Sequence, residues 1–293
     1  MVKYIIASLF FSVFVCFSQA QESIAQWDSL LSLKLDTARQ SKSIPLMDTR
    51  NKEFVQLLKK TLEMEGAFNH PFDSLSKKMS TITSPDGTFR LFNWNIEDIY
   101  KEHNFYCLVL FFDKKTDKYK VIELKDNYRR IFDAENKQLD HRNWYGALYY
   151  KIIPMEKGRS ESYTLLGWNG KGPTTTQKLI EVMQFDGSDR IKFGAPIFKY
   201  PNGIKKRMIL EFADDAIVSL KYHEKKDDKR IIYNHVAPMN PEVEGIKDFY
   251  YPDVTFDALI LQNGKWIYEG ETDVRHEENL KNFKDPKKLE EKF

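Results

Sequence analysis

A long series of short β-patterned segments, beginning after Ser80, leaves few folds open to this chain. The segments are rich in β-branched and aromatic residues, which favour pleated sheet. Ser84-Pro85-Asp86-Gly87 predicts a turn between the first two of them. Turn pairs such as Asn169-Gly170 and Asp186-Gly187 separate several others, and glycine supplies the positive φ that tight turns require. The expected strands are 81–83, 88–94, 105–112, 119–124, 147–153, 163–168, 178–185, 207–213, 216–222, 230–235, 256–261 and 265–268.

The spacing of apolar residues indicates how these strands are used. Residues 105–112 are apolar on both faces, which fits a strand buried on both sides. Met208, Leu210 and Phe212 alternate with polar neighbours, a pattern typical of antiparallel sheet with one face in water. The apolar spacing of 178–185 also suits a helix, so this segment is open to both interpretations.

The chain before Ser80 has helical spacing instead. Apolar residues predict a first helix from residue 24, with Ser23 as N-cap, and a second helix over 52–65. Pro45 is expected to separate them, and a short third helix is expected at 73–79. The predicted fold class is therefore α+β: a short helical N-terminal part packed on a large, mainly antiparallel β region, either a sandwich or an open barrel.

The first residues predict where the protein works. Lys3 precedes an uncharged run over 4–17, and small or polar residues follow up to Ala20. This is the pattern of a secretory signal peptide, 1–20, and the run is shorter than the ~20 residues of a membrane span. Cys16 raises the alternative of a lipoprotein, but Val15 is larger than the residue that such processing prefers. We expect an exported protein, periplasmic or secreted, with association with the outer membrane left open.

Composition excludes some classes of partner. The formal net charge is +2, whereas nucleic-acid and anionic-membrane binding select for basic excess. After cleavage Cys107 is the one cysteine left, so an intrachain disulfide is unexpected. A transmembrane segment is also unexpected, because no apolar run after residue 20 approaches spanning length. The sequence divides into a helical segment (21–80), a β-rich domain (81–275) and a charged tail (276–293) interpreted as a surface segment or frayed helix. It leaves the oligomeric state open.

Familiar catalytic patterns are incomplete. The glycines and lysine of 170–174 lack phosphate-loop spacing, and the His-Glu pairs at His223 and His276 lack the second histidine of a zinc protease. Residues 158–162 lack the last glycine of a serine-hydrolase elbow. Apolar neighbours of Cys107 predict a buried, unreactive thiol. The sequence thus predicts no catalytic residue, no metal site and no cofactor.

One segment stands out as a binding surface. Residues 235–257 combine prolines, a glycine, a histidine, tyrosines and aspartates, and they are interpreted as a long connection. Long ordered loops often carry binding residues. The opposing interpretation is a packed loop that covers a sheet edge, with its histidine hydrogen-bonded and its tyrosines half buried. The predicted binding residues are His235, Tyr250, Tyr251, Asp253 and Asp257.

Four stretches carry a resemblance. Residues 144–153, 163–170, 234–238 and 251–253 are similar to stretches in uncharacterised exported proteins of Bacteroidota-type Gram-negative bacteria. The resemblance extends over roughly 80–275. It implies export and a bacterial origin of this type, with no activity and no residue roles.

Three functions follow as hypotheses. The first is a non-catalytic binding or structural module of the cell envelope, which contacts an envelope protein or glycan through 235–257. The second is a secreted hydrolase of polysaccharide or peptide, with carboxylates that only the fold brings together. The third is a carrier of a small ligand or lipid. Fold alone does not decide among them.

Overall fold

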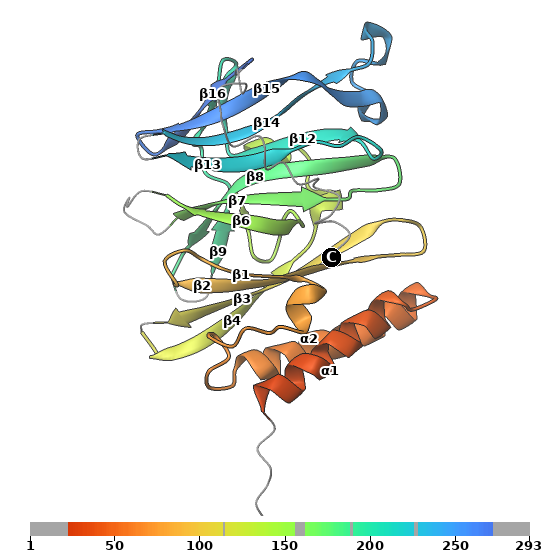
Figure 1. Cartoon of the computed structure of the whole chain (residues 1–293), viewed down its shortest axis with the longest axis vertical. Helices are drawn as coiled ribbons and strands as arrows, with labels where there is room; N and C mark the ends of the chain where they lie inside the picture. The colour runs from red at the N-terminus through yellow and green to blue at the C-terminus, as the bar shows by residue number, and fades with distance from the viewer. Residues whose placement is uncertain (1–22, 114, 156–161, 188–189, 226–227, 272–293) are drawn as a thin grey trace, which may run out of the picture.

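The computed structural model describes residues 23–271 except 114, 156–161, 188–189 and 226–227. The predicted signal peptide (1–20) and charged tail (276–293) lie outside the described residues. Within them, two α-helices precede three mostly antiparallel sheets (Figure 1), which confirms the α+β prediction. None of the described helices is both long and apolar enough to cross a membrane.

Two helices form the first layer. α1 (Ile24–Arg39) begins after Ser23, the predicted N-cap, and the Ser23 side chain forms a capping box with Gln26. α2 (Ile44–Leu62) begins earlier than the expected residue 52, because Pro45 lies in its first turn. Proline is tolerated there, since that N–H has no partner within the helix. The expected third helix is only a 3₁₀ turn, η1 (Leu75–Lys77).

The helix-side sheet is a four-stranded antiparallel meander. Its strands are β1 (Ser80–Thr83), β2 (Phe89–Glu97), β3 (His103–Asp113) and β4 (Lys118–Lys125), paired in chain order. The predicted Ser84-Pro85-Asp86-Gly87 turn joins β1 to β2, and Gly87 has a φ of 69°. Cys107 on β3 is buried and free, and burial raises the pKa of its thiol, as expected for an unreactive cysteine.

The middle sheet is built around β8 (Thr175–Phe185). Residues 175–183 of β8 are all buried, which explains why the apolar spacing of this strand does not show a wet face. The sheet order is β5-β9-β8-β7-β6, and β12 also pairs with β8. The remaining strands are β5 (Leu139–Asp140), β6 (Leu148–Pro154), β7 (Ser162–Asn169), β9 (Ile191–Phe193) and β12 (Arg207–Ala213).

One prediction about β12 is wrong. Alternation placed the polar side chains of this strand in water, but Arg207 is 0% exposed and Glu211 only 15% exposed. Both are held by ion pairs, to Glu181 and Lys171 respectively. A buried charge that finds a partner has the same sequence pattern as a solvated one, so alternation could not separate them.

The outer sheet contains the C-terminal strands and one parallel pair. Its order is β11-β10-β16-β15-β14-β13, with β10 parallel to β16. Its strands are β10 (Phe198–Tyr200), β11 (Gly203–Lys205), β13 (Leu220–Lys225), β14 (Asp228–Pro238), β15 (Tyr250–Gln262) and β16 (Lys265–Glu269).

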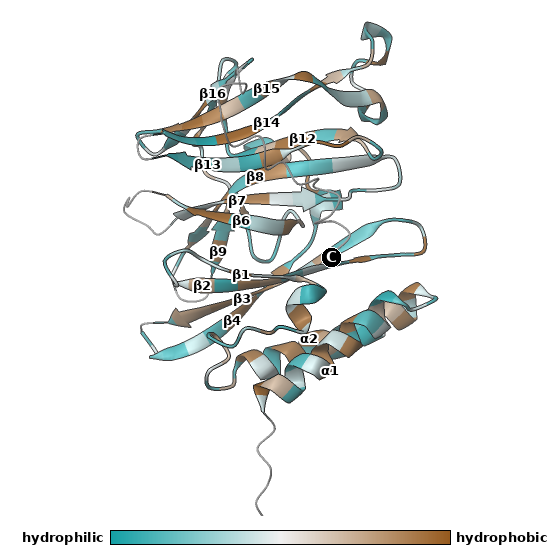
Figure 2. Cartoon of the chain, viewed as in Figure 1, coloured by the Kyte–Doolittle hydropathy of each residue, from teal (hydrophilic) through white to brown (hydrophobic). Residues whose placement is uncertain are grey.

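The layers stack in the order helices, helix-side sheet, middle sheet and outer sheet (Figure 1). Apolar residues run along both helices and along strands of every sheet (Figure 2). The three largest buried clusters of the described residues lie one at each junction between layers. Phe54 and Trp94 belong to the first, Phe89 and Leu165 to the second, and Leu166 and Trp266 to the third. The three sheets are open and packed face to face, so the sandwich alternative describes them and the barrel does not.

Candidate functional site

The predicted binding segment is mostly strand. β14 continues to Pro238 and β15 begins at Tyr250, and these two residues are paired in register. Only 239–249 connects them, with two 3₁₀ turns, η4 (Pro241–Val243) and η5 (Lys247–Phe249). The expected long loop over 235–257 is therefore wrong. Its prolines indicated a loop, and Pro241 does lie in the connection, but Pro238 and Pro252 lie in the paired strands.

His235 and Asp257 meet across this hairpin. The ladder shifts register between Asn234 and Val236, and His235 lies at that irregularity. Its Nδ1 is 2.9 Å from Oδ2 of Asp257; the histidine side chain is 41% exposed and the aspartate only 8% exposed. The hydrogen bond to Asp257 raises the pKa of His235 above its usual value, and nearby Asp253 adds to the effect.

Asp253 lies near this pair but has partners of its own. One of its carboxylate oxygens accepts from the backbone N–H and the hydroxyl of Thr255, at 2.7 and 2.6 Å. Burial alone would raise the pKa of Asp253, but these hydrogen bonds and His235 bring it below its usual value. The structure thus brings together three of the five predicted residues: His235, Asp253 and Asp257.

The two predicted tyrosines point elsewhere and order the hairpin. The hydroxyl of Tyr250 accepts from the Gly245 N–H at 2.9 Å, and the Lys247 ammonium lies 3.5 Å from the centre of its ring. The hydroxyl of Tyr251 donates to Asp215 at 2.9 Å, which ties the hairpin to the turn after β12. Both side chains therefore shape the segment rather than join His235.

A group of tyrosines behind the aspartate was not expected. Tyr233 is the cross-strand neighbour of Asp257, and the rings of Tyr200 and Tyr268 stack with centroids 5.1 Å apart. Burial, followed by the charge of Asp257, raises the pKa of Tyr268 to about 12. These residues come from three strands distant in sequence, so no local pattern indicates them.

The end of the hairpin carries exposed apolar side chains. We define the hairpin tip as Met239, Ile246 and Phe249 of the connection together with Val254, which lies farther along β15 opposite the register shift; their exposed fractions are 68%, 49%, 44% and 94%. This end projects beyond the stacked sheets at the upper right of Figure 1. Apolar side chains grouped on a projecting element are typical of contact surfaces.

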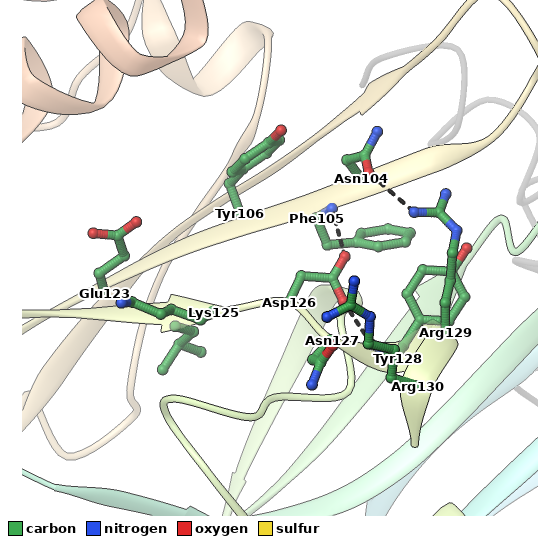
Figure 3. A pocket seen from close by; sticks show the side chains of 11 residues that line it. Asn104, Phe105, Tyr106, Glu123, Lys125, Asp126, Asn127, Tyr128, Arg129 and Arg130 are labelled. Carbon is green, nitrogen blue, oxygen red and sulfur yellow. Dashed lines mark hydrogen bonds between the residues drawn. The ribbon is translucent and has the colours of Figure 1, made fainter. Parts of the chain in front are cut away.

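A cavity of about 460 Å³ lies elsewhere, at the ends of β3 and β4 (Figure 3). Asp126 accepts there from the N–H groups of Phe105 and Tyr128, at 3.0 and 3.1 Å, and burial raises its pKa. Gly146 is required beside it, because a Cβ at that position would overlap the Asp126 carboxylate. The cavity wall also carries Lys125, Arg129 and Arg130.

A second cavity, of about 510 Å³, follows β4 next to the first. None of the five predicted residues lines either of these two cavities. Sequence reasoning missed both of them. The polar, charged run 125–130 directly after a strand is the one local signal that pointed to the first.

Among the residues that the structure describes, no group of three or more His, Cys, Asp or Glu side chains is placed to hold a metal ion. The His235–Asp257 pair is an imidazole oriented by a carboxylate, an arrangement that suits hydrogen bonding or proton transfer. Comparison with protein-family models, with curated proteins and with solved structures found no match for this chain.

Proposed function

We propose that this chain is an exported binding module of the cell envelope that contacts a protein partner through the hairpin tip. The observation that carries the proposal is the exposure of Met239, Ile246, Phe249 and Val254 at the projecting end of β14 and β15. The signal-peptide pattern before Ala20 supports export.

The construction of the hairpin supports a surface held ready for contact. The connection 239–249 is ordered by the Tyr250–Gly245 hydrogen bond, and Tyr251 anchors its base to Asp215. Ordering a surface in advance lowers the entropy cost of binding. A protein partner suits the tip better than a glycan does, because three of its four side chains are aliphatic and offer no aromatic face for a sugar ring.

Site-specific photo-crosslinking in the producing cells tests this proposal. A benzophenone side chain replaces Val254 in the full-length chain, and the matched control places it at Phe132, which is 77% exposed but lies outside the hairpin. We expect a discrete protein adduct from position 254 and none from 132. Met239→Ser combined with Phe249→Ser should abolish the adduct without changing the folded fraction. Equal adducts from both positions, or none from 254, would contradict the proposal.

The His235–Asp257 pair is the observation that favours a second candidate, a secreted hydrolase. General acid–base catalysis typically contributes about 10²–10⁴-fold to a rate. In that case His235→Ala should reduce hydrolysis of a polysaccharide or peptide substrate by a similar factor, while Phe249→Ser should leave the rate unchanged. If His235→Ala retains full activity on any substrate that the chain hydrolyses, this pair is not the catalytic group.

A further inference from the structure

One edge of the helix-side sheet has no neighbouring strand. β4 is its last strand, and Lys125 shows which residues point outward: its N–H donates to His141 at 2.7 Å and its C=O accepts from Trp144 at 2.9 Å, both on the side away from β3. Because N–H and C=O directions alternate along a strand, Tyr119, Val121 and Glu123 point the same way. Within the described part of the chain, nothing hydrogen-bonds to their backbone groups.

This open edge lies in a groove. The cavity of about 510 Å³ follows residues 119–123, and its other lining residues are Glu63, just after α2, and His141, in the turn after β5. The turn closes the edge where His141 bonds to Lys125, so about five residues of β4 remain available. A groove between two flanking elements admits a single extended chain more easily than the edge of a second folded sheet.

Charge at one end of the groove is not balanced. Glu123 is already paired with Lys59 at 2.6 Å. Lys125 and Arg130 are exposed, and neither has an ion-pair partner among the described residues. Both line the neighbouring cavity of about 460 Å³, which shares Glu123 with the groove (Figure 3). The Lys125 side chain is directed toward Glu123 and that of Arg130 lies past Asp126 (Figure 3), so the acidic side chains of a peptide would meet the two cations one after the other.

We propose that the open edge of β4 accepts an extended peptide segment as an added strand, with acidic side chains of the peptide placed next to Lys125 and Arg130. Backbone hydrogen bonds to Tyr119, Val121 and Glu123 would supply affinity, and the two cations would select acidic sequences. This site is separate from the hairpin tip and does not depend on the function proposed for it.

Selection from peptide libraries tests the proposal. The full-length chain is screened against octapeptides in which valine or isoleucine alternates with threonine and one end carries glutamate. A second library carries lysine in place of the glutamate. We expect binders from the glutamate library only. Val121→Pro should lower their affinity at least tenfold, because proline removes an outward N–H without interrupting the β3 ladder. Val121→Thr, which keeps that N–H, should change the affinity less than twofold.

A ligand-side series decides the question even if Val121→Pro fails to fold. A selected peptide N-methylated on the residues that face β4 should lose at least tenfold in affinity for the wild-type chain, and one methylated on the alternate residues should not. The absence of binders, binders indifferent to both changes, or equal selection from the lysine library would overturn the proposal. So would a dimer in sedimentation experiments that Val121→Pro dissociates, because the occupant would then be a second copy of the chain.

Discussion

At the scale of single residues, the ion pair between Arg207 and Glu181 is the most demanding arrangement in the interior. The two residues are cross-strand neighbours on β12 and β8, their Nε and Oε2 atoms are 2.6 Å apart, and both side chains are 0% exposed. The Tyr149 hydroxyl donates to the other oxygen of Glu181, and Arg207 donates to the carbonyl of Ala134. Each charge is therefore compensated by more than its ionic partner, which buried charges require.

Removing one partner of this pair should be much worse than removing both. Arg207→Met or Glu181→Leu alone should lower the free energy of unfolding by about 3–5 kcal/mol, because each leaves a buried charge without compensation. The double variant should cost less than either single variant. Urea denaturation measures all three. Lys34→Met, which breaks an exposed pair with Glu53, is the control and should cost under about 1 kcal/mol. Additive single costs would contradict this account.

His235 should make stability depend on pH in a defined direction. The hydrogen bond to Asp257 raises its folded-state pKa above the unfolded value of about 6.5, so its stabilising effect is complete below that pH. The effect is lost as pH rises through the raised folded-state pKa. Denaturation of wild type and His235→Gln should therefore show a larger difference at pH 5.5 than at pH 9. In an Asp257→Asn background the difference should depend much less on pH, because only the smaller effects of Asp253 and Glu271 remain. A larger difference at high pH would refute the assignment.

At the scale of elements, local chemistry predicted the strands well where turns and alternation agreed. The Ser84–Gly87 turn and the first helix with its Ser23 cap are examples. Prediction failed where one residue type has two uses. Pro45 was interpreted as a helix breaker although it begins α2, and the prolines of 235–257 were interpreted as a loop although they lie in a hairpin. Whether a proline lies in a strand ladder or in the first turn of a helix depends on the tertiary structure, which the local sequence does not show.

The candidate site shows the same division. The prediction selected His235, Asp253 and Asp257, which the structure brings together, because it identified a segment with unusual composition. The pairing itself depends on the register shift between Asn234 and Val236, and no residue pattern encodes that shift. The groove along β4 depends on the open sheet edge and on the placement of α2, so it was out of reach of sequence reasoning.

At the scale of the whole molecule, the middle sheet is the element that the other layers share. One face of the middle sheet packs against the helix-side sheet, and the other face packs against the outer sheet. Because neither face of the central strand β8 meets water, its residues 175–183 are all buried, the polar Gln177 and Glu181 among them. The helical part and the β14–β15 hairpin lie at opposite ends of the stack (Figure 1).

Two neighbouring residues of β7 test this arrangement directly. Leu165 lies in the cluster between the helix-side and middle sheets, and Leu166 in the cluster between the middle and outer sheets; both are 0% exposed. Leu165→Ala and Leu166→Ala should each lower the free energy of unfolding by about 2–5 kcal/mol, because each leaves a cavity in a packed core. In a two-layered sandwich one of the two would face water and cost within about 0.5 kcal/mol. Urea denaturation of the two variants separates these cases. Similar large losses in the free energy of unfolding require a sheet buried on both faces, whereas one near-neutral variant would contradict the stack of three sheets.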